Sequence, residues 1–296
     1  RGRRPRAHVW FVHSGDASCV TPPVRLTDKL QKTIIGYSNT IALALGTIGM
    51  INIQYAVKDD IVYVLEANTR ASRTAPYLSK AIGIPIVKIA TQLIMGKTLK
   101  ELGLHGVAKS KVFAVKSVVF PFQKLKGVDF VLGPEMKSTG ESMGMDYSFG
   151  KAFYKAMLGA NVNIPSEGLV VVTLNDESKP QAEELAARLH ALGFTVGATR
   201  GTAGQMGRMR DKVAILKKVS EGEPNIVTRL KKGEVAFVIN TPSKGKKSFT
   251  DGYKIRREAI DYNVPCITTI EAAMSIIAAL EEVKKEGVSV KSIVDY

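Results

Sequence analysis

Residues 50–68, "MINIQYAVKDDIVYVLEAN", predict the β-hairpin that decides the fold of the first part of the chain. The arms "MINIQYAV" and "IVYVLEAN" alternate and are rich in β-branched residues, with the turn "KDD" between them, which is typical of antiparallel strands. If residues 59–61 form the loop, Gln54 lies opposite Glu66 across the ladder. Period-two alternation then places Asn68 on the same face as Glu66.

Two arginines, Arg70 and Arg73, follow the second arm. The side-chain oxygens of Gln54, Glu66 and Asn68, with two guanidinium groups just beyond, suit a hard divalent cation that bridges nucleotide phosphates. A solvated strand end with surface ion pairs explains the same spacing equally well. The residues alone therefore leave a metal and phosphate site and a plain strand end both open.

The segments around the hairpin predict an α/β arrangement. Apolar residues recur at helical spacing over residues 29–49, and residues 85–104 predict two short helices. Residues 97–165 give mixed signals and are expected to connect two domains. Within them "FAVKSVVFPF" predicts a strand, "FGKAFYKAMLG" a helix and "GPEMKSTGESMG" a glycine-rich loop.

Strand and helix patterns alternate from residue 166 to the end. Such alternation predicts a parallel sheet with helices on both faces, and hence a second domain at residues 166–296. The expected strands are "LVVVTL", "FTVGAT", "VAFVINT" and "VPCITT", and the expected helices are "PQAEELAARLHALG", "DKVAILKKV", "GYKIRREAIDYN" and "IEAAMSIIAALEEVKKEG".

Composition limits the classes of protein to consider. The 296 residues carry a formal net charge of +15, which raises the question of nucleic-acid binding. The cations are spread over the opening "RGRRPR" and loops such as "TPSKGKKSF" instead of one stripe interleaved with aromatic residues, so we expect no nucleic-acid partner. No apolar run is long enough for a membrane span, no signal peptide is evident, and the two cysteines form no framework, so we expect a soluble, cytoplasmic protein.

A second set of polar residues follows two strands of the predicted parallel sheet. The loops "GATRGTAG" and "VINTPSKGKKS" come at the carboxyl ends of strands, where ligands bind in open sheets. Thr199, Thr202 and Asn240 offer side-chain hydrogen bonds to an anion there, and Lys179 and Lys218 add charge. Tight turns with exposed lysines are the alternative interpretation.

The stretch "NIQYAVKDDIVYVLEANTRASRTAPYLSKAIGIPIVKIA" resembles the C-terminal part of the ATP-grasp domain in the large chain of carbamoyl-phosphate synthetase. The resemblance runs from about Val12 to the end of the chain. It is carried by an ordered set of further stretches: "VHSGDAS", "TPP", "FPFQKLKGVD", "LGPEMKSTGE" and "MG".

The resemblance implies an ATP-dependent ligase whose Gln54, Glu66 and Asn68 hold Mg²⁺ or Mn²⁺ against the ATP phosphates. Arg70 and Arg73 would stabilise phosphoryl charge, and His13 and Ser14 would line the nucleotide pocket. The implied reaction is phosphorylation of carbamate to carbamoyl phosphate, with ammonia supplied by a glutaminase small subunit and with homo-oligomers plausible. Thr69 stands where the family commonly has proline, which affects loop rigidity more than ligation.

The last domain resembles the methylglyoxal-synthase-like domain that binds allosteric effectors such as nucleotides. The matching positions are Lys179, Thr199, Thr202, Lys218, Asn240 and Thr241. Pro242 replaces a common threonine, which leaves the effector's identity open, and Ser117 replaces a glutamate linked to ornithine activation. Methylglyoxal synthase activity itself is not expected, because "ATRGTAGQMG" supplies no catalytic carboxylate.

The predicted organisation is a partial ATP-grasp domain at residues 1–96, a connecting region at 97–165 and the effector domain at 166–296. Residues 1–11 do not resemble the family, and its glycine-rich lid and phosphate-binding lysine have no counterpart here, so we expect the chain alone not to turn over ATP. The alternative function is an effector-binding module without catalysis. The sequence does not decide whether the product serves arginine synthesis, pyrimidine synthesis or both.

Overall fold

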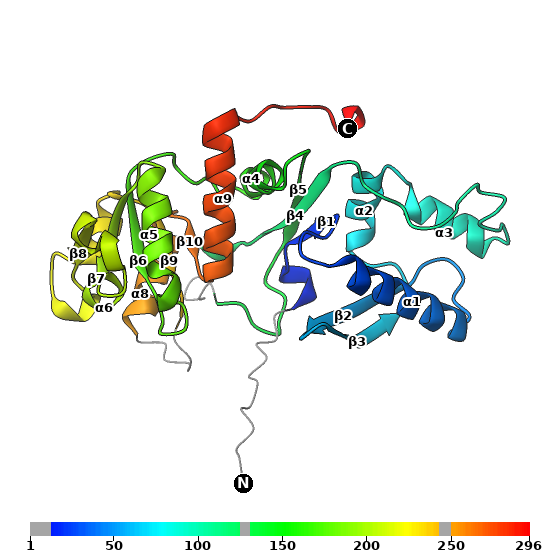
Figure 1. The fold of residues 1–296 in the computed structure, drawn as a ribbon, viewed down its shortest axis with the longest axis horizontal. Helices are drawn as coiled ribbons and strands as arrows, with labels where there is room; N and C mark the ends of the chain where they lie inside the picture. Colours follow the sequence, from blue (N-terminus) through cyan, green and yellow to red (C-terminus); the bar gives the residue numbers. More distant parts are fainter. Residues whose placement is uncertain (1–12, 125–130, 243–249) are drawn as a thin grey trace, which may run out of the picture. The chain divides into compact units, whose positions relative to one another are not determined.

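The computed structural model describes residues 13–124, 131–242 and 250–296, apart from the side chains of Ser14 and Gln123. The chain forms two compact units (Figure 1). Of the described residues, the first unit comprises those up to Ser18, those within Ser117–Gly144 and those within Phe149–Ser289. The second unit comprises Cys19–Lys116, Met145–Ser148 and Val290–Tyr296.

The second unit contains the predicted hairpin, formed by β2 (Asn52–Lys58) and β3 (Ile61–Asn68), together with α1 (Asp28–Ala44). Helix α1 begins where the Thr27 side chain accepts a hydrogen bond from the backbone of Leu30, a normal N-cap. Its residue Ser38 meets the hydroxyl of Tyr55 on β2 at 2.8 Å. Helix α1 therefore covers one face of the hairpin.

Two helices, α2 (Thr74–Ile82) and α3 (Ile86–Ile94), follow the hairpin. Helix α2 ends at Gly83, whose φ of 69° is left-handed and favours glycine. Tyr77 on α2 is buried and donates a 2.6 Å hydrogen bond to the carbonyl of Ala114. This contact fixes α2 against the strand that contains Ala114.

A three-stranded sheet has the order β1 (Cys19–Thr21), β4 (Phe113–Val119), β5 (Gly140–Asp146). β1 runs antiparallel to β4, with Val20 opposite Val115. Helix α4 (Phe149–Gly159) follows β5 and packs tightly on it. A methyl group on Gly144 of β5 would lie 2.1 Å from the carbonyl oxygen of Ala152, so only glycine allows this approach.

The first unit contains a five-stranded sheet whose order is β10-β9-β6-β7-β8, with all pairs parallel. The central strand β6 is flanked by β7 and β9, so the chain segments after these three strands meet at one end of the sheet. The bounds are β6 Leu169–Thr173, β7 Thr195–Thr199, β8 Val213–Leu216, β9 Val235–Asn240 and β10 Cys266–Ile267.

Helices cover both faces of this sheet (Figure 1). Val170 and Val172 of β6 pack with α5 (Ala182–Ala191) and α9 (Ile270–Glu286), whereas Val171 packs with α7 (Ile226–Lys231) and α8 (Asp251–Asp261). Because alternate residues enter different cores, β6 is apolar throughout. The remaining elements are the short helix α6 (Arg200–Ala203) and 3-10 turns at Ser14–Asp16, Phe122–Lys124, Lys179–Gln181, Gly207–Lys212, Val219–Glu221 and Ile293–Asp295.

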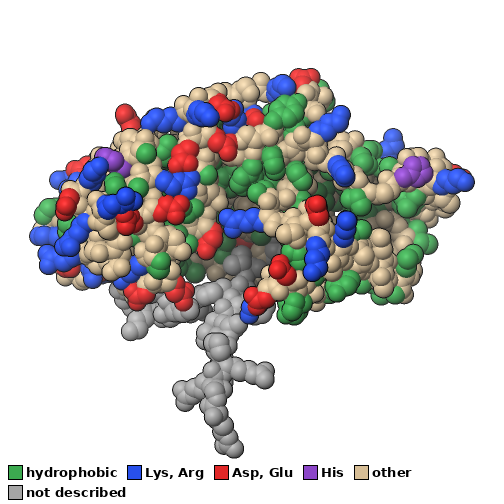
Figure 2. Space-filling view, viewed as in Figure 1, with side chains coloured by type: hydrophobic (Ala, Val, Ile, Leu, Met, Phe, Trp, Pro, Cys, Tyr) green, Lys and Arg blue, Asp and Glu red, His purple; other side chains and the backbone are tan. Residues whose placement is uncertain are grey.

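On the face shown in Figure 2, lysine and arginine side chains are interspersed with acidic ones. No single described helix has the length and apolarity of a membrane span; only the bent pair of α2 and α3, at 109° to each other, reaches that length and composition together.

The α/β class and the parallel-sheet domain of the predicted fold are confirmed. The hairpin, the helix over residues 149–159 and the four strands predicted after residue 166 are also present. All three of the longer helices predicted there are found with small changes in their bounds.

Four local predictions are wrong. Residues 211–219 do not form a helix, because "VAIL" pairs with β7 as β8; a short apolar run fits either state, and tertiary pairing decides. The helix predicted to residue 49 ends at Ala44, and Gly46 beyond it is left-handed. Residues 98–103 form turns instead of a second helix, and the loop predicted at 133–144 ends within β5.

Replacing Gly144 by alanine should lower the free energy of unfolding by about 1–3 kcal/mol or more, because the added methyl group collides with backbone atoms of α4. Gly133→Ala is the matched control, since its added methyl would have no neighbour within 4 Å. Urea denaturation followed by circular dichroism measures both. Equal stability of the two variants would contradict this packing.

Candidate functional sites

The hairpin register is set by a turn and a bulge. Asp59 and Asp60 form a two-residue turn, with φ of 51° and 58°. Next to this turn Lys58 pairs with Ile61, and the pairing continues in the same register until Tyr55 pairs with Val64. The register then shifts by one residue, and Gln54 pairs with Glu66. The three-residue loop assumed at residues 59–61 is wrong. The predicted pairing of Gln54 with Glu66 is nevertheless correct, because the bulge adds one residue to β3 at Leu65.

The bulge places four polar side chains on one face of the hairpin. Tyr55 points to α1, so by alternation Gln54 and its partner Glu66 point to the opposite face, which α1 does not cover. Asn68 lies beside Glu66 and donates from Nδ2 to Oε1 at 3.0 Å. Asn52 pairs with Asn68 and belongs to the same face. Sequence reasoning missed Asn52, although its spacing of two from Gln54 could have revealed it.

These side chains fit a hard cation by the chemistry of their donors. Gln54, Asn52 and Asn68 offer amide oxygens, and Glu66 offers a carboxylate whose Oε1 is already held by Asn68. Mg²⁺ takes oxygen ligands and is usually bound through one or two carboxylates plus substrate phosphates. Glu66 is exposed, so a ligand can reach it. A single carboxylate suits a metal that arrives with its nucleotide.

Arg70 and Arg73 stand between the hairpin and α2. The backbone N–H of Arg70 donates to the carbonyl of Asn68 at 2.8 Å, and its Nη1 donates to the carbonyl of Ala71 at 3.0 Å. Arg70 also lines a hollow of about 190 Å³ together with residues of α3. Arg73 is exposed at the residue before α2. Both arginines thus belong to the second unit, in the segment that joins β3 to α2.

His13 and Ser14 belong to the first unit, and the hairpin belongs to the second. The ring Nδ1 of His13 accepts a hydrogen bond from the backbone of Gly15 at 3.0 Å. Asp16, 3% exposed, accepts from the backbone N–H groups of Lys137 and Ser138 at 2.8 Å each. The Asp16 carboxylate therefore ties "HSGD" to "GPEMKST".

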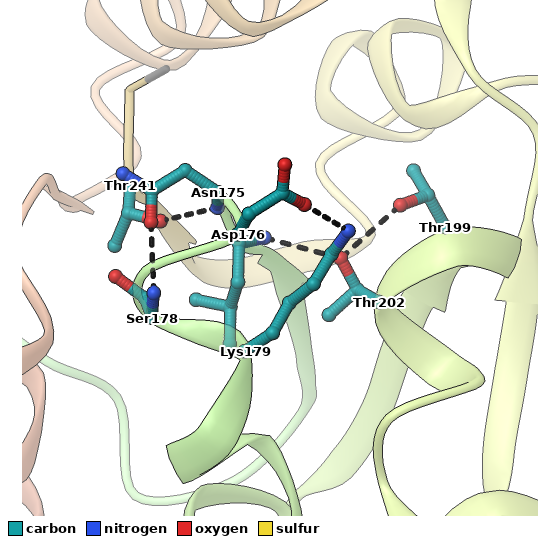
Figure 3. Close-up of polar contacts among 8 residues, drawn as sticks. Asn175, Asp176, Ser178, Lys179, Thr199, Thr202 and Thr241 are labelled. Carbon is teal, nitrogen blue, oxygen red and sulfur yellow. Dashed lines mark hydrogen bonds and ion pairs between the residues drawn. The ribbon is translucent and has the colours of Figure 1, made fainter. Parts of the chain in front are cut away.

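The second candidate site lies at the carboxyl end of the parallel sheet (Figure 3). The loop after β6 is held on both sides by threonines: Thr202 Oγ1 accepts from the backbone of Leu174 at 3.1 Å, and Thr241 Oγ1 accepts from the backbone of Asn175 at 2.8 Å. Thr199 Oγ1 contacts Thr202 Oγ1 at 3.4 Å. All three threonines are buried.

The threonine contacts leave donors for a ligand. A hydroxyl has one proton and two lone pairs, so accepting a backbone N–H does not use its own proton. Among the described residues, no contact commits the protons of Thr202 or Thr241 to another acceptor. The loops therefore present fixed hydroxyl donors at the end of β6.

The two lysines and the asparagine of the predicted effector set, Lys179, Lys218 and Asn240, have different surroundings. Lys179 forms an ion pair with Asp176 at 2.5 Å, and this contact lowers the pKa of Asp176. Asn240 donates from Nδ2 to Thr173 Oγ1 at 2.6 Å. Lys218 is exposed after β8, and no hydrogen bond in the described residues joins its side chain to the other five. The sheet thus brings five of the six residues around one loop.

Comparison with known proteins gives two family matches. Residues 6–102 match the ATP-binding domain of the carbamoyl-phosphate synthase L chain, and residues 181–268 match the MGS-like domain. The hairpin lies inside the first match and the threonine-lined loops of Thr199, Thr202 and Thr241 inside the second.

Individual relatives agree over nearly the whole chain. A carbamoyl phosphate synthase large chain from Archaeoglobus fulgidus is 51% identical over 96% of this chain and 26% of its own length. C-terminal sections of such large chains are 47% identical in Methanopyrus kandleri, over 96% of this chain and 54% of theirs, and 47% in Methanocaldococcus jannaschii, over 95% and 47%. This chain is a homologue of the C-terminal part of carbamoyl phosphate synthase large chains.

The chain spans between about a quarter and about half of the length of these relatives. Among solved structures, the biotin carboxylase domain of a single-chain bacterial carboxylase aligns over 48% of this chain and 39% of its own with a TM-score of 0.39 and 17% identity, too weak to support an argument. The resemblance stated from the sequence is confirmed, and the matches to an ATP-binding domain and an MGS-like domain agree with it.

Replacing Asp16 by asparagine should lower the free energy of unfolding at pH 7 by about 1–3 kcal/mol, because an amide nitrogen would face a backbone N–H. Burial opposes ionisation, but hydrogen bonds from Ser138 and Lys137 outweigh it and keep the pKa of Asp16 below its usual value. A depressed pKa stabilises the fold above the unfolded pKa of about 3.9, and this stability is lost as pH falls through the folded pKa.

Denaturation between pH 2 and pH 7 measures this effect. Asp16→Asn should show a smaller loss of stability on acidification below about pH 4 than the wild type. Asp211→Asn, an exposed carboxylate in the same unit, is the control. An unchanged acid profile in Asp16→Asn would refute the role of this carboxylate.

Proposed function

We propose that this chain supplies one wall of the ATP site that phosphorylates carbamate in a carbamoyl phosphate synthase, together with a domain that binds an allosteric effector. The overall reaction makes carbamoyl phosphate from bicarbonate, ammonia and ATP. The observation that supports the catalytic part is the bulged register, which aligns Gln54, Glu66 and Asn68 on one open face of the hairpin.

In this proposal Gln54, Glu66 and Asn68 hold Mg²⁺ or Mn²⁺, which neutralises the ATP phosphates. Arg70 and Arg73 stabilise the charge of the transferring phosphoryl group, since guanidinium groups match phosphate geometry. His13 and Ser14 contact the nucleotide. Catalysis is then positioning and charge neutralisation by side chains that need no covalent step.

Glu66→Gln should weaken binding of Mn²⁺ in the presence of ATP at least about tenfold, because the only carboxylate of the set is lost while its shape is kept. Asp59→Asn is the matched control: it removes a carboxylate from the turn of the same hairpin, and asparagine tolerates the left-handed backbone there. Electron paramagnetic resonance of Mn²⁺ with the purified chain measures both affinities. Equal affinities in Glu66→Gln and wild type would reject the site.

The effector proposal rests on the fixed hydroxyl donors of Thr202 and Thr241 around the loop after β6, with Thr199 donating to Thr202. With Lys179, Lys218 and Asn240 they would bind a phosphate-bearing ligand. If a nucleotide phosphate raises the melting temperature but Mn²⁺ and ATP do not bind, the alternative function, an effector-binding module without catalysis, is favoured.

Asp176→Asn should strengthen phosphate binding several-fold, because the ion pair that occupies Lys179 in the free protein is removed. Lys179→Met should weaken it, and Glu183→Gln, which disturbs an exposed ion pair with Arg208 elsewhere in the same unit, should leave it unchanged. Thermal shift with inorganic phosphate and with nucleoside monophosphates provides the measurement. A weaker response in Asp176→Asn than in wild type would contradict competition for Lys179.

The wider setting is also a proposal. A glutaminase small subunit would deliver ammonia, the enzyme would work in the cytoplasm, and homo-oligomers are compatible with the family. The boundaries 1–96, 97–165 and 166–296 stand as proposed functional divisions of the chain. A role in arginine or pyrimidine synthesis follows from the product.

A further inference from the structure

Arg256 is a buried arginine inside the domain of the parallel sheet. It lies on α8 and is 5% exposed, whereas arginine is rarely buried unless it is paired. Its neighbour Arg257 instead forms an ion pair with Asp261 on the same helix. The burial of Arg256 therefore indicates that its guanidinium group has a specific partner inside the domain.

The Nη1 of Arg256 donates a hydrogen bond of 2.7 Å to Oδ1 of Asn240, the last residue of β9. The other end of the same amide, Nδ2, donates to Thr173 Oγ1 at 2.6 Å. Gly252, in the first turn of α8, lies over this pair: a methyl group there would be 3.3 Å from Nη1 and 3.5 Å from Nδ2. The arginine and the amide are thus packed as one unit.

This contact decides which end of Asn240 faces the loops. A guanidinium group can only donate hydrogen bonds, so it must meet the oxygen of the amide and never its nitrogen. The NH₂ group then points toward the end of β6, where it donates to Thr173 Oγ1 and where the hydroxyls of Thr202 and Thr241 accept backbone N–H groups. Without Arg256 the amide could rotate and present its oxygen, which repels an anion.

We propose that Arg256 is a positioning residue of the effector site, which fixes Asn240 as a hydrogen-bond donor through its contact with the amide oxygen. The ligand class that fits is an anion with several acceptor oxygens, such as a phosphate group. This inference rests on the proposed effector function. It assigns to the site a residue that never touches the ligand.

The test is a double-mutant cycle with inorganic phosphate as the probe, followed by calorimetry. Arg256→Met and Asn240→Ala should each weaken phosphate binding about tenfold or more, and the double variant should bind no more weakly than either single one. Arg256→Lys keeps the charge and one donor and should recover part of the affinity. Arg257→Met, the neighbouring arginine, should stay within about twofold of the wild type.

A second readout does not depend on the ligand. The side-chain amide signals of Asn240 in ¹⁵N spectra should move in Arg256→Met and stay in place in Arg257→Met. Gly252→Ala keeps both Arg256 and Asn240 but presses on their contact, so it should weaken phosphate binding if Arg256→Met does not fold.

The outcomes separate two failures. Phosphate binding by the wild type with equal affinity in Arg256→Met, or strictly additive losses in the cycle, would overturn the positioning role while the effector site stands. No phosphate binding by the wild type at millimolar concentration would overturn the effector proposal and this inference with it. Unmoved Asn240 amide signals in Arg256→Met would also refute the orientation argument.

Discussion

A single extra residue in β3 is the constraint on which the candidate catalytic face depends. Strand side chains alternate, so a shift of one residue moves every later side chain to the opposite face. The turn at Asp59 and Asp60 sets one register, and the bulge at Leu65 changes it before Glu66 is reached. Bulges often occur next to active sites because they re-aim side chains. Here the bulge joins Glu66 and Asn68 to the face of Gln54.

The loops of the proposed effector site hold their side chains in place by a different device. Their threonines first satisfy backbone N–H groups that would otherwise be buried without partners, as Thr202 does for Leu174 and Thr241 does for Asn175. The hydroxyls are thereby immobilised before any ligand arrives. Preorganised donors lower the entropy lost on binding. A buried threonine can therefore serve the fold and a ligand at once.

Elements with a long, regular pattern were predictable, and those decided by tertiary pairing were not. The apolar run of β6 indicates a strand and the apolar spacing of α9 indicates a helix from the local sequence alone. The four residues of β8 fit a helix as well as a strand, and only pairing with β7 selects the strand. In the candidate site, the pairing of Gln54 with Glu66 was predicted correctly, although the loop assumed for it at residues 59–61 was wrong. Arg256 gave no local signal, because its role depends on a contact with Asn240.

Two cations of the proposed effector site, Lys179 and Arg256, have different partners in the free protein. An unpaired cation in a partly dry site would cost free energy, and a fully paired one would not attract an anion. Lys179 is paired with an exposed carboxylate, Asp176, which solvent and a stronger anion can replace. Arg256 is instead buried and donates to the oxygen of an amide, that of Asn240. In the proposed effector site, Lys179 is thus the cation that can change its partner when an anion arrives, and Arg256 is the one that holds a donor in place.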